Sequence, residues 1–105
     1  MVGVDLVNIP DFAKNLDQAG EWLLERTFLA SELGNRKIEH LAGIFAAKEA
    51  VIKALSMKAG SWLEIEITHS PVGQPCAKVG QKNINVSISH AGDYATAVAQ
   101  TNYEQ

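Results

Sequence analysis

The sequence predicts an α+β protein in which an antiparallel sheet packs against a long central helix. Three observations lead to this class. A short strand rich in β-branched residues opens the chain at residues 2–9, helical periodicity fills most of residues 11–55, and four strand patterns follow from residue 63 onward. The 105 residues are enough for one small domain with a modest core, predicted over residues 1–105.

Composition and charge exclude several classes of function. Apolar residues make up 47% of the chain and charged residues 20%, which is typical of a folded domain. The net charge of −3 provides no basic surface for nucleic acid. Cys76 is the single cysteine, so an internal disulfide and a zinc site of thiolates are excluded, and a reducing cytoplasm is expected. We expect neither export nor membrane insertion, because there is no signal peptide and no run of about 18 apolar residues.

The first strand contains a charged residue where strand propensity disfavours one. With side chains alternating along residues 2–9, Gly3, Asp5 and Val7 share one face. A glycine on that face would allow another backbone or a ligand to come close to the carboxylate. Asp5 is therefore either a feature of a bulge or sheet edge, or a functional carboxylate.

Helical spacing of apolar residues extends over residues 11–33, with Gly20 as the expected break. A turn at residues 31–34 follows. Asn35 is then the expected N-cap of the central helix, whose main stretch is HLAGIFAAKEAVIKAL at residues 40–55.

The central helix has a carboxylate among its apolar residues. At about 100° per residue, Leu41, Phe45 and Ile52 define an apolar arc, and Glu49 falls inside it. An ionised carboxylate on a buried face costs several kcal/mol unless a cation, a metal or hydrogen bonds compensate it. Two interpretations stay open: a Glu49–Lys53 pair one turn apart, worth only about 0.2–0.5 kcal/mol, or a metal or phosphate site.

The C-terminal half is predicted to be a series of strands. Leu63, Ile65 and Ile67 alternate with polar residues, which predicts a half-buried strand over residues 63–69. Turns containing proline or glycine separate three further strands, predicted over residues 76–79, 83–90 and 94–100.

The three histidines give weaker signals. His90 ends a predicted strand, on the same face as Val86 and Ile88, where it is either a structural residue or a ligand contact. His40 and His69 have no spacing that suggests a zinc site.

Asp5 and Glu49 form a candidate pair of oxygen ligands. One lies on a buried strand, and the other on the buried side of the helix that must cover that strand. Such a pair suits Mg²⁺, because this ion prefers oxygen ligands and leaves positions for water and substrate phosphate. Lys53, one turn after Glu49, would meet the same phosphate.

Five segments together resemble the holo-acyl-carrier-protein synthase group of 4'-phosphopantetheinyl transferases. They occur in the family's order and span nearly the whole chain: GVDLVNI at 3–9, FLASE at 28–32, FAAKEAVIKAL at 45–55, IEI at 65–67 followed by GQP at 73–75, and VSISH at 86–90. The resemblance implies that family's fold. It also implies transfer of the phosphopantetheine arm from coenzyme A to a serine of an apo acyl carrier protein, which leaves adenosine 3',5'-bisphosphate.

The resemblance further implies roles for single residues. Asp5 and Glu49 would hold Mg²⁺ with the coenzyme A pyrophosphate, Lys53 would neutralise the phosphates, and His90 would approach the nucleotide end. Asp5, Glu49 and Lys53 are thus the candidate catalytic residues. The candidates for binding coenzyme A are Lys53, His90 and Lys48, with a structural role as the preferred alternative for Lys48. Whether Glu49 or a water held at the site takes the serine proton stays open. Short members of the family are homotrimers with sites between subunits, and a chain of 105 residues fits that class.

The sequence departs from the family pattern at three places near the site. Ile44 replaces an arginine that would meet a coenzyme A phosphate, and we expect Ile44 on the border of the apolar arc. Leu29 replaces a threonine, and the family's Gly-Thr-Gly loop is absent after Leu55. These departures support an alternative hypothesis, a non-catalytic coenzyme A-binding or assembly module of the same fold.

The surface expected to meet an acidic carrier protein is also unusual. The first helical region offers only Lys14 and Arg26 as basic residues, among several acidic ones. Docking therefore involves either an unusual carrier protein or another surface, such as Arg36 and Lys37.

Overall fold

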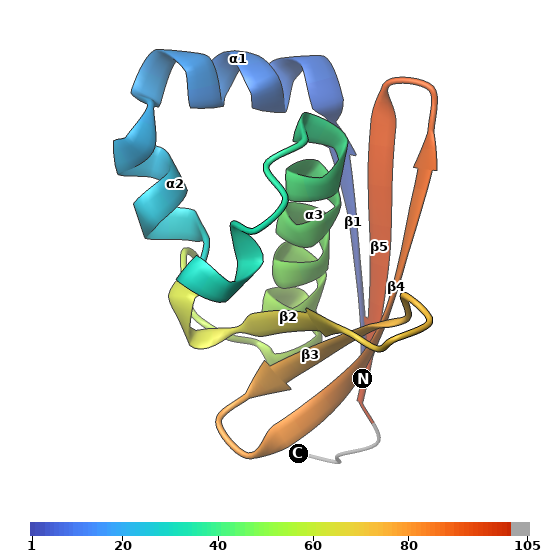
Figure 1. Cartoon of the computed structure of the whole chain (residues 1–105). Helices are drawn as coiled ribbons and strands as arrows, with labels where there is room; N and C mark the ends of the chain where they lie inside the picture. Colours follow the sequence, from blue (N-terminus) through green and yellow to red (C-terminus); the bar gives the residue numbers. More distant parts are fainter. Residues whose placement is uncertain (102–105) are drawn as a thin grey trace.

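A computed structural model describes residues 1–101, so residues 102–105 of the predicted domain lie outside the described residues. Helices cover one face of a five-stranded antiparallel sheet (Figure 1). In spatial order the strands are β1 (Val2–Asn8), β5 (Tyr94–Gln100), β4 (Lys82–Ala91), β3 (Pro75–Val79) and β2 (Glu66–His69). The helical elements are α1 (Ile9–Ala19), α2 (Glu21–Thr27), η1 (Ala30–Glu32), α3 (Ile38–Leu55) and η2 (Trp62–Glu64), where η denotes a 3-10 helix. The predicted α+β class and the order of one strand, helices and four strands are confirmed.

Two local predictions are wrong. Leu63 is not in a strand: it lies in η2 and is 47% exposed, because residues 61–65 form the short-range hydrogen bonds of a 3-10 turn and β2 begins only afterwards. Asn35 is not the N-cap of α3. Its Oδ1 accepts a hydrogen bond from the Lys37 backbone N–H (3.0 Å), which forms a turn just before the helix, and Lys37 occupies the cap position.

The break between the first two helices lies where the sequence predicts it. Gly20 separates α1 from α2 with φ of 65°, a left-handed value that glycine adopts at little cost. The helical segment begins earlier than predicted, at Ile9, because the Asn8 side chain caps it by accepting a hydrogen bond from the Asp11 N–H (2.9 Å).

Small residues allow α3 to lie directly against the first strand. A Cβ atom added at Gly3 would overlap the carbonyl oxygen of Ala50 on α3. Ala97 on β5 and Ala47 on α3 are also almost completely buried. The expected close approach at Gly3 therefore occurs, and the approaching backbone is that of α3. As a result, the inner face of β1, with Asp5, is pressed against the helix.

The burial of α3 extends well beyond one apolar arc. Ile44 is 1% exposed, so its expected position on the border of the arc is wrong. Ile44 faces the side on which Ile67 of β2 and Glu32 of η1 lie, and these elements close over that part of the helix. Although α3 has 18 residues, none of the helices within residues 1–101 is long and apolar enough to cross a membrane.

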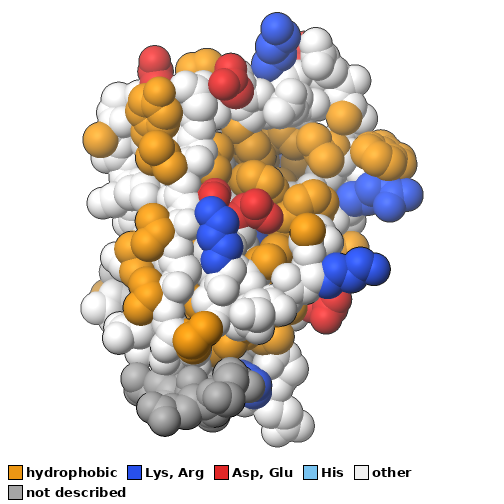
Figure 2. All heavy atoms as spheres, turned by 180° about the vertical axis from the view of Figure 1, so that it is seen from behind, with side chains coloured by type: hydrophobic (Ala, Val, Ile, Leu, Met, Phe, Trp, Pro, Cys, Tyr) orange, Lys and Arg blue, Asp and Glu red, His pale blue; other side chains and the backbone are white. Residues whose placement is uncertain are grey.

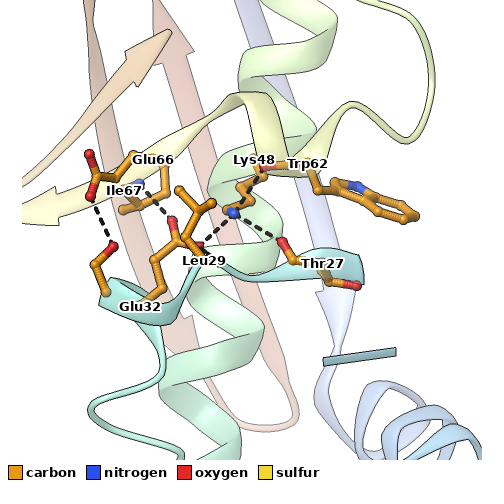
Figure 3. A network of polar contacts seen from close by, with 8 residues as sticks. Thr27, Leu29, Glu32, Lys48, Trp62, Glu66 and Ile67 are labelled. Carbon is orange, nitrogen blue, oxygen red and sulfur yellow. Dashed lines mark hydrogen bonds and ion pairs between the residues drawn. The ribbon is translucent and has the colours of Figure 1, made fainter. Parts of the chain in front are cut away.

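A buried ion pair joins α3 to the segment before it. Lys48 and Glu32 both have side chains that are fully buried, and Lys48 Nζ lies 2.6 Å from Glu32 Oε1 (Figure 3). Lys48 Nζ also donates to the backbone carbonyls of Thr27 (2.9 Å) and Trp62 (3.0 Å). Its three donors therefore have three acceptors.

The Glu32 carboxylate is equally well satisfied. Its Oε1 also accepts from the Leu29 N–H (2.8 Å), and its Oε2 accepts from the Ile67 N–H of β2 (2.7 Å). Burial lowers the pKa of the Lys48 ammonium, and the nearby Glu32 carboxylate partly offsets that effect. Removing one partner would leave a desolvated charge, so the pair must be kept or lost as a unit.

We expect Glu32→Gln and Lys48→Met each to lower the free energy of unfolding by about 3–5 kcal/mol, because each leaves a buried charge without its counter-ion. The double variant should lose clearly less than the sum of the two single losses. Urea unfolding followed by circular dichroism, at one protein concentration, measures all three values.

The matched control is Glu21→Gln, which breaks the exposed Glu21–Arg36 pair and should cost no more than about 1 kcal/mol. Strictly additive losses in the double variant would show that the buried charges do not depend on each other.

Candidate active site

Asp5 lies on the inner face of β1, against α3, with 14% of its side chain exposed. Its Oδ1 is 3.0 Å from Lys53 Nζ of α3, and the same ammonium donates to the Val4 carbonyl (2.9 Å). The Asp5 carbonyl in turn accepts a hydrogen bond from the Thr96 hydroxyl (2.8 Å), which fixes the backbone at this point. The charged residue of the first strand is thus held in place and neutralised by a half-exposed lysine.

Glu49 lies one helical turn before Lys53 and is half-buried. Its Oε2 accepts a hydrogen bond from the indole Nε1–H of Trp62 (2.8 Å). The interpretation of Glu49 as the i,i+4 partner of Lys53 is therefore wrong for this structure. The ion pair of Lys53 within residues 1–101 is with Asp5, and Glu49 is compensated by an indole instead.

The two carboxylates leave oxygens suited to a cation. Across residues 1–101, Asp5 Oδ2 and Glu49 Oε1 accept no hydrogen bond. The described chain has no group of three or more side chains that would bind a metal by themselves. Mg²⁺ is commonly bound by one or two carboxylates together with water and substrate phosphates, so the chemistry of this donor pair fits that ion.

One face of the molecule combines a few charged side chains with many apolar ones. Viewed from behind, the molecule shows acidic and basic side chains meeting near the centre of the face, among many hydrophobic side chains (Figure 2). An apolar surrounding strengthens the interactions of the charges it contains.

Lys48 is not part of this cluster. It follows Phe45 by one turn, but its side chain points into the protein and its three donors are occupied by Glu32, Thr27 and Trp62. No donor remains for a coenzyme A phosphate, so the predicted coenzyme contact does not fit, and the structural alternative does.

His90 lies away from the carboxylates, at the N-terminal end of α3. Its Nε2 is 2.9 Å from the Glu39 carbonyl oxygen, and its ring lies against Gly43, where a Cβ would come within 3.1 Å of Nε2. This contact satisfies the structural alternative for His90. The ring also lines a cavity of about 190 Å³, so a ligand contact there stays a prediction.

The fold brings His40 and His69 together, which their spacing did not predict. Their rings lie side by side with centroids 5.5 Å apart and planes tilted by 34°, and both line the same cavity as His90, together with Gly73 and Pro75. Burial lowers the pKa of His40, and the positive charges that His69 and His90 can carry lower it further. The His40 imidazole is therefore harder to protonate than a free one, and an anion bound beside it would offset that effect.

The sequence reasoning assigned no role to two residues that support the site. Glu32 is the last residue of the FLASE segment, one of the segments that carry the family resemblance. Its place in that segment was a signal that this glutamate has a role. Trp62 had no signal of this kind, because its contact with Glu49 depends on how the segment after α3 folds back.

Residues 1–99 match the family described as the 4'-phosphopantetheinyl transferase superfamily. The holo-[acyl-carrier-protein] synthase of Corynebacterium efficiens is 37% identical over 131 aligned positions, covering 97% of this chain and 93% of the relative. That of Thermodesulfovibrio yellowstonii is 38% identical over 104 positions, covering 91% and 92%. Since 131 positions exceed the 105 residues of this chain, the first relative contains segments that are missing here.

Solved structures agree with this relationship. The chain is similar to Helicobacter pylori holo-[acyl-carrier-protein] synthase in complex with coenzyme A, with a TM-score of 0.88, 34% identity and coverage of 94% and 97%. The synthase from Bacillus anthracis, in complex with CoA (3',5'-ADP), gives a TM-score of 0.80, 31% identity and coverage of 93% and 91%. The chain therefore belongs to the 4'-phosphopantetheinyl transferase superfamily, in the group of the holo-[acyl-carrier-protein] synthases.

Proposed function

We propose that this protein transfers the 4'-phosphopantetheine arm of coenzyme A to a serine hydroxyl of an apo acyl carrier protein. The observation that carries the proposal is the meeting of β1 and α3, where Lys53 joins Asp5 and Glu49 lies one turn away. Relatives named holo-[acyl-carrier-protein] synthase, and relatives solved with coenzyme A, support the same reaction. The proposed compartment is the cytoplasm, expected from the single cysteine of the sequence.

In the proposed step, the serine oxygen forms a bond to the β-phosphorus of coenzyme A. The bond from that phosphorus to the bridging oxygen of the pyrophosphate breaks, and the leaving group is adenosine 3',5'-bisphosphate. A bound Mg²⁺ would supply positive charge to the pyrophosphate as negative charge builds there. Positioning and electrostatic stabilisation would account for most of the catalysis, as in other phosphoryl transfers.

The chain's own residues would divide the work. Asp5 and Glu49 would hold the cation through the oxygens that accept no hydrogen bond within residues 1–101. Lys53 has a side chain that is 54% exposed, so its ammonium can turn from Asp5 toward a phosphate when the substrate arrives. Glu49 also stays a candidate for accepting the serine proton.

The alternative is a non-catalytic coenzyme A-binding or assembly module of the same fold. It is motivated by Ile44 and by the missing glycine-rich loop. Incubation with coenzyme A, Mg²⁺ and a panel of apo carrier proteins separates the two functions. A phosphopantetheine mass gain on the carrier protein, measured by mass spectrometry, supports the transferase, and coenzyme A binding without any gain supports the module.

We propose that the nucleotide end of coenzyme A reaches the cavity lined by His40, His69 and His90. No arginine or lysine lines this cavity in the described part of the chain, and the nearby Ile44 is part of its wall. Imidazoles would then supply the positive charge that an arginine supplies in the family pattern. The carboxylate closest to this region on β2, Glu66, is held by the Ser31 hydroxyl (2.9 Å).

We propose that the protein assembles as a homotrimer with coenzyme A bound between subunits. Helices cover one face of the sheet, while the opposite face of β1 and β5 presents Val2, Val4, Leu6, Tyr94 and Val98, each 42–63% exposed. Contiguous exposed apolar side chains of this kind are typical of protein–protein interfaces. A domain of this size has little surface with which to enclose coenzyme A, so a neighbouring subunit would complete the site.

Asp5→Asn and Glu49→Gln should each reduce Mg²⁺-dependent transfer by about a hundredfold or more, because each weakens a charged ligand of the cation. Asp5→Asn should lower stability by no more than about 1 kcal/mol, since the side chain of its partner Lys53 is about half exposed to solvent. Transfer is followed by mass spectrometry and stability by urea unfolding. The control is Asp93→Asn, which alters an exposed carboxylate in the β4–β5 turn and should leave transfer unchanged. Full activity in Asp5→Asn would show that Asp5 is not a ligand of the metal.

Coenzyme A binding should become tighter as the pH falls from 8 to 6. The pKa of His40 is lowered from its ordinary value of 6.5 in the free protein, and an anion beside the ring would raise it, so binding takes up a proton. Calorimetry at several pH values measures the affinity. Phosphate groups also titrate near pH 6, so the wild type is compared with His40→Gln. The affinity of the variant for coenzyme A should depend less on pH. Identical pH dependence in the two proteins would show that the anion binds elsewhere.

Val4→Lys should dissociate the proposed trimer, because it places a charge in the centre of the apolar face of β1. Light scattering of the wild type should give a mass three times that of the 11.3 kDa chain. The variant should give a mass close to that of a single chain. Val72→Lys is the matched control, since Val72 is 82% exposed in the turn between β2 and β3. A wild type that is monomeric at micromolar concentration contradicts the trimer.

A further inference from the structure

Trp62 makes contacts with three residues of α3 that lie within one turn. Its backbone carbonyl accepts from Lys48 Nζ (3.0 Å), and its indole Nε1–H donates to Glu49 Oε2 (2.8 Å). Its ring packs against Phe45, with centroids 5.8 Å apart. Two consecutive helical residues, Lys48 and Glu49, thus bind the backbone and the side chain of the same tryptophan.

These contacts fix Trp62 from both ends. The carbonyl is anchored to a lysine that is itself fully buried and paired with Glu32. The same carbonyl accepts the Ile65 N–H (3.2 Å) within the 3-10 turn. Figure 3 shows the side chain of Trp62 pointing away from the buried ion pair, so the anchored backbone leaves the indole to reach another group. The indole N–H therefore donates to the Glu49 carboxylate from a residue whose backbone is fixed.

The hydrogen bond from Trp62 also makes the two carboxylate oxygens of Glu49 different from each other. Oε2 is occupied by the indole, whereas Oε1 accepts no hydrogen bond from residues 1–101. A carboxylate held in this way is restricted in rotation and offers one oxygen to a cation. Partners of this type commonly orient metal ligands, and their loss typically costs about 10- to 100-fold in metal affinity or activity.

We propose that Trp62 is a positioning residue that holds the Glu49 carboxylate in the orientation required to bind the divalent cation. The proposal rests on the proposed function of Asp5 and Glu49 as the cation site. Trp62 has no direct contact with substrate in this role. It acts through Glu49, and the connection from Ser56 to Ser61, which differs from the family's glycine-rich loop, brings it into place.

Trp62→Phe tests the proposal, because it keeps a ring beside Phe45 and removes the indole N–H. Calorimetric titration of Mg²⁺ into the protein saturated with coenzyme A, corrected by titration into coenzyme A alone, should show about tenfold weaker binding in the variant. Transfer activity should fall at low Mg²⁺ and return toward the wild-type rate at high Mg²⁺. A purely structural role for Trp62 would lower the rate at every Mg²⁺ concentration, and the thermal melting curve would show the loss of stability.

Tryptophan fluorescence provides a readout that does not depend on turnover. The chain has two tryptophans, so Trp22→Phe leaves Trp62 as the only one. Trp22 is 60% exposed on α2, under the Arg26 guanidinium, and its replacement should leave Mg²⁺ affinity unchanged. In that background, Mg²⁺ should change the Trp62 emission in a saturable way, and adding Glu49→Gln should abolish the change.

The outcomes separate this proposal from the proposed function. Tight Mg²⁺ binding in the wild type with unchanged affinity in Trp62→Phe overturns the positioning role and leaves the cation site intact. Mg²⁺ binding that leaves Trp62 emission unaltered also argues against it. A wild type that binds coenzyme A but no Mg²⁺ overturns the cation site, and the positioning role with it.

Discussion

The buried pair of Lys48 and Glu32 is the interaction on which the rest of the structure depends. Two charges have been removed from water, and they are tolerated because every donor of the ammonium and three lone-pair sites of the carboxylate are used. Through these bonds the end of α2, η1, α3, η2 and the first residues of β2 are tied to one point (Figure 3). Segments that lack regular hydrogen bonding to one another are thereby held in a single arrangement.

That arrangement connects the core to the chemistry. Lys48 and Glu49 are neighbours on α3, so the residue that faces inward fixes the helix whose next residue faces the proposed cation site. Gly3 brings β1 into direct contact with the same helix, and this closeness allows Lys53 to reach Asp5. A rigid strand and a rigid helix, rather than mobile loops, therefore hold the catalytic candidates, which suits a reaction that relies on positioning.

Ile44 shows how a departure from a family pattern can be accommodated. Its side chain is almost completely buried, so an apolar residue satisfies this position with no need for a charged group at the rim. The nearby cavity is lined by the imidazoles of His40, His69 and His90 and, within the described residues, by no lysine or arginine. Imidazoles change charge near neutral pH whereas a guanidinium does not, and this difference would make anion binding here responsive to pH.

The sequence by itself determined the α+β class, the order of the elements, the break at Gly20 and the unusual character of Asp5 and Glu49. These follow from local periodicity and from charges placed on buried faces, which a single chain displays directly. Only the tertiary structure decided the partners: Asp5 for Lys53, Trp62 for Glu49, Glu32 for Lys48, and His69 for His40. These pairs are distant in sequence or depend on how a turn folds back, and no local pattern encodes such contacts. For the same reason Leu63 and Asn35 were misplaced, since turn hydrogen bonds overrode their strand and cap signals.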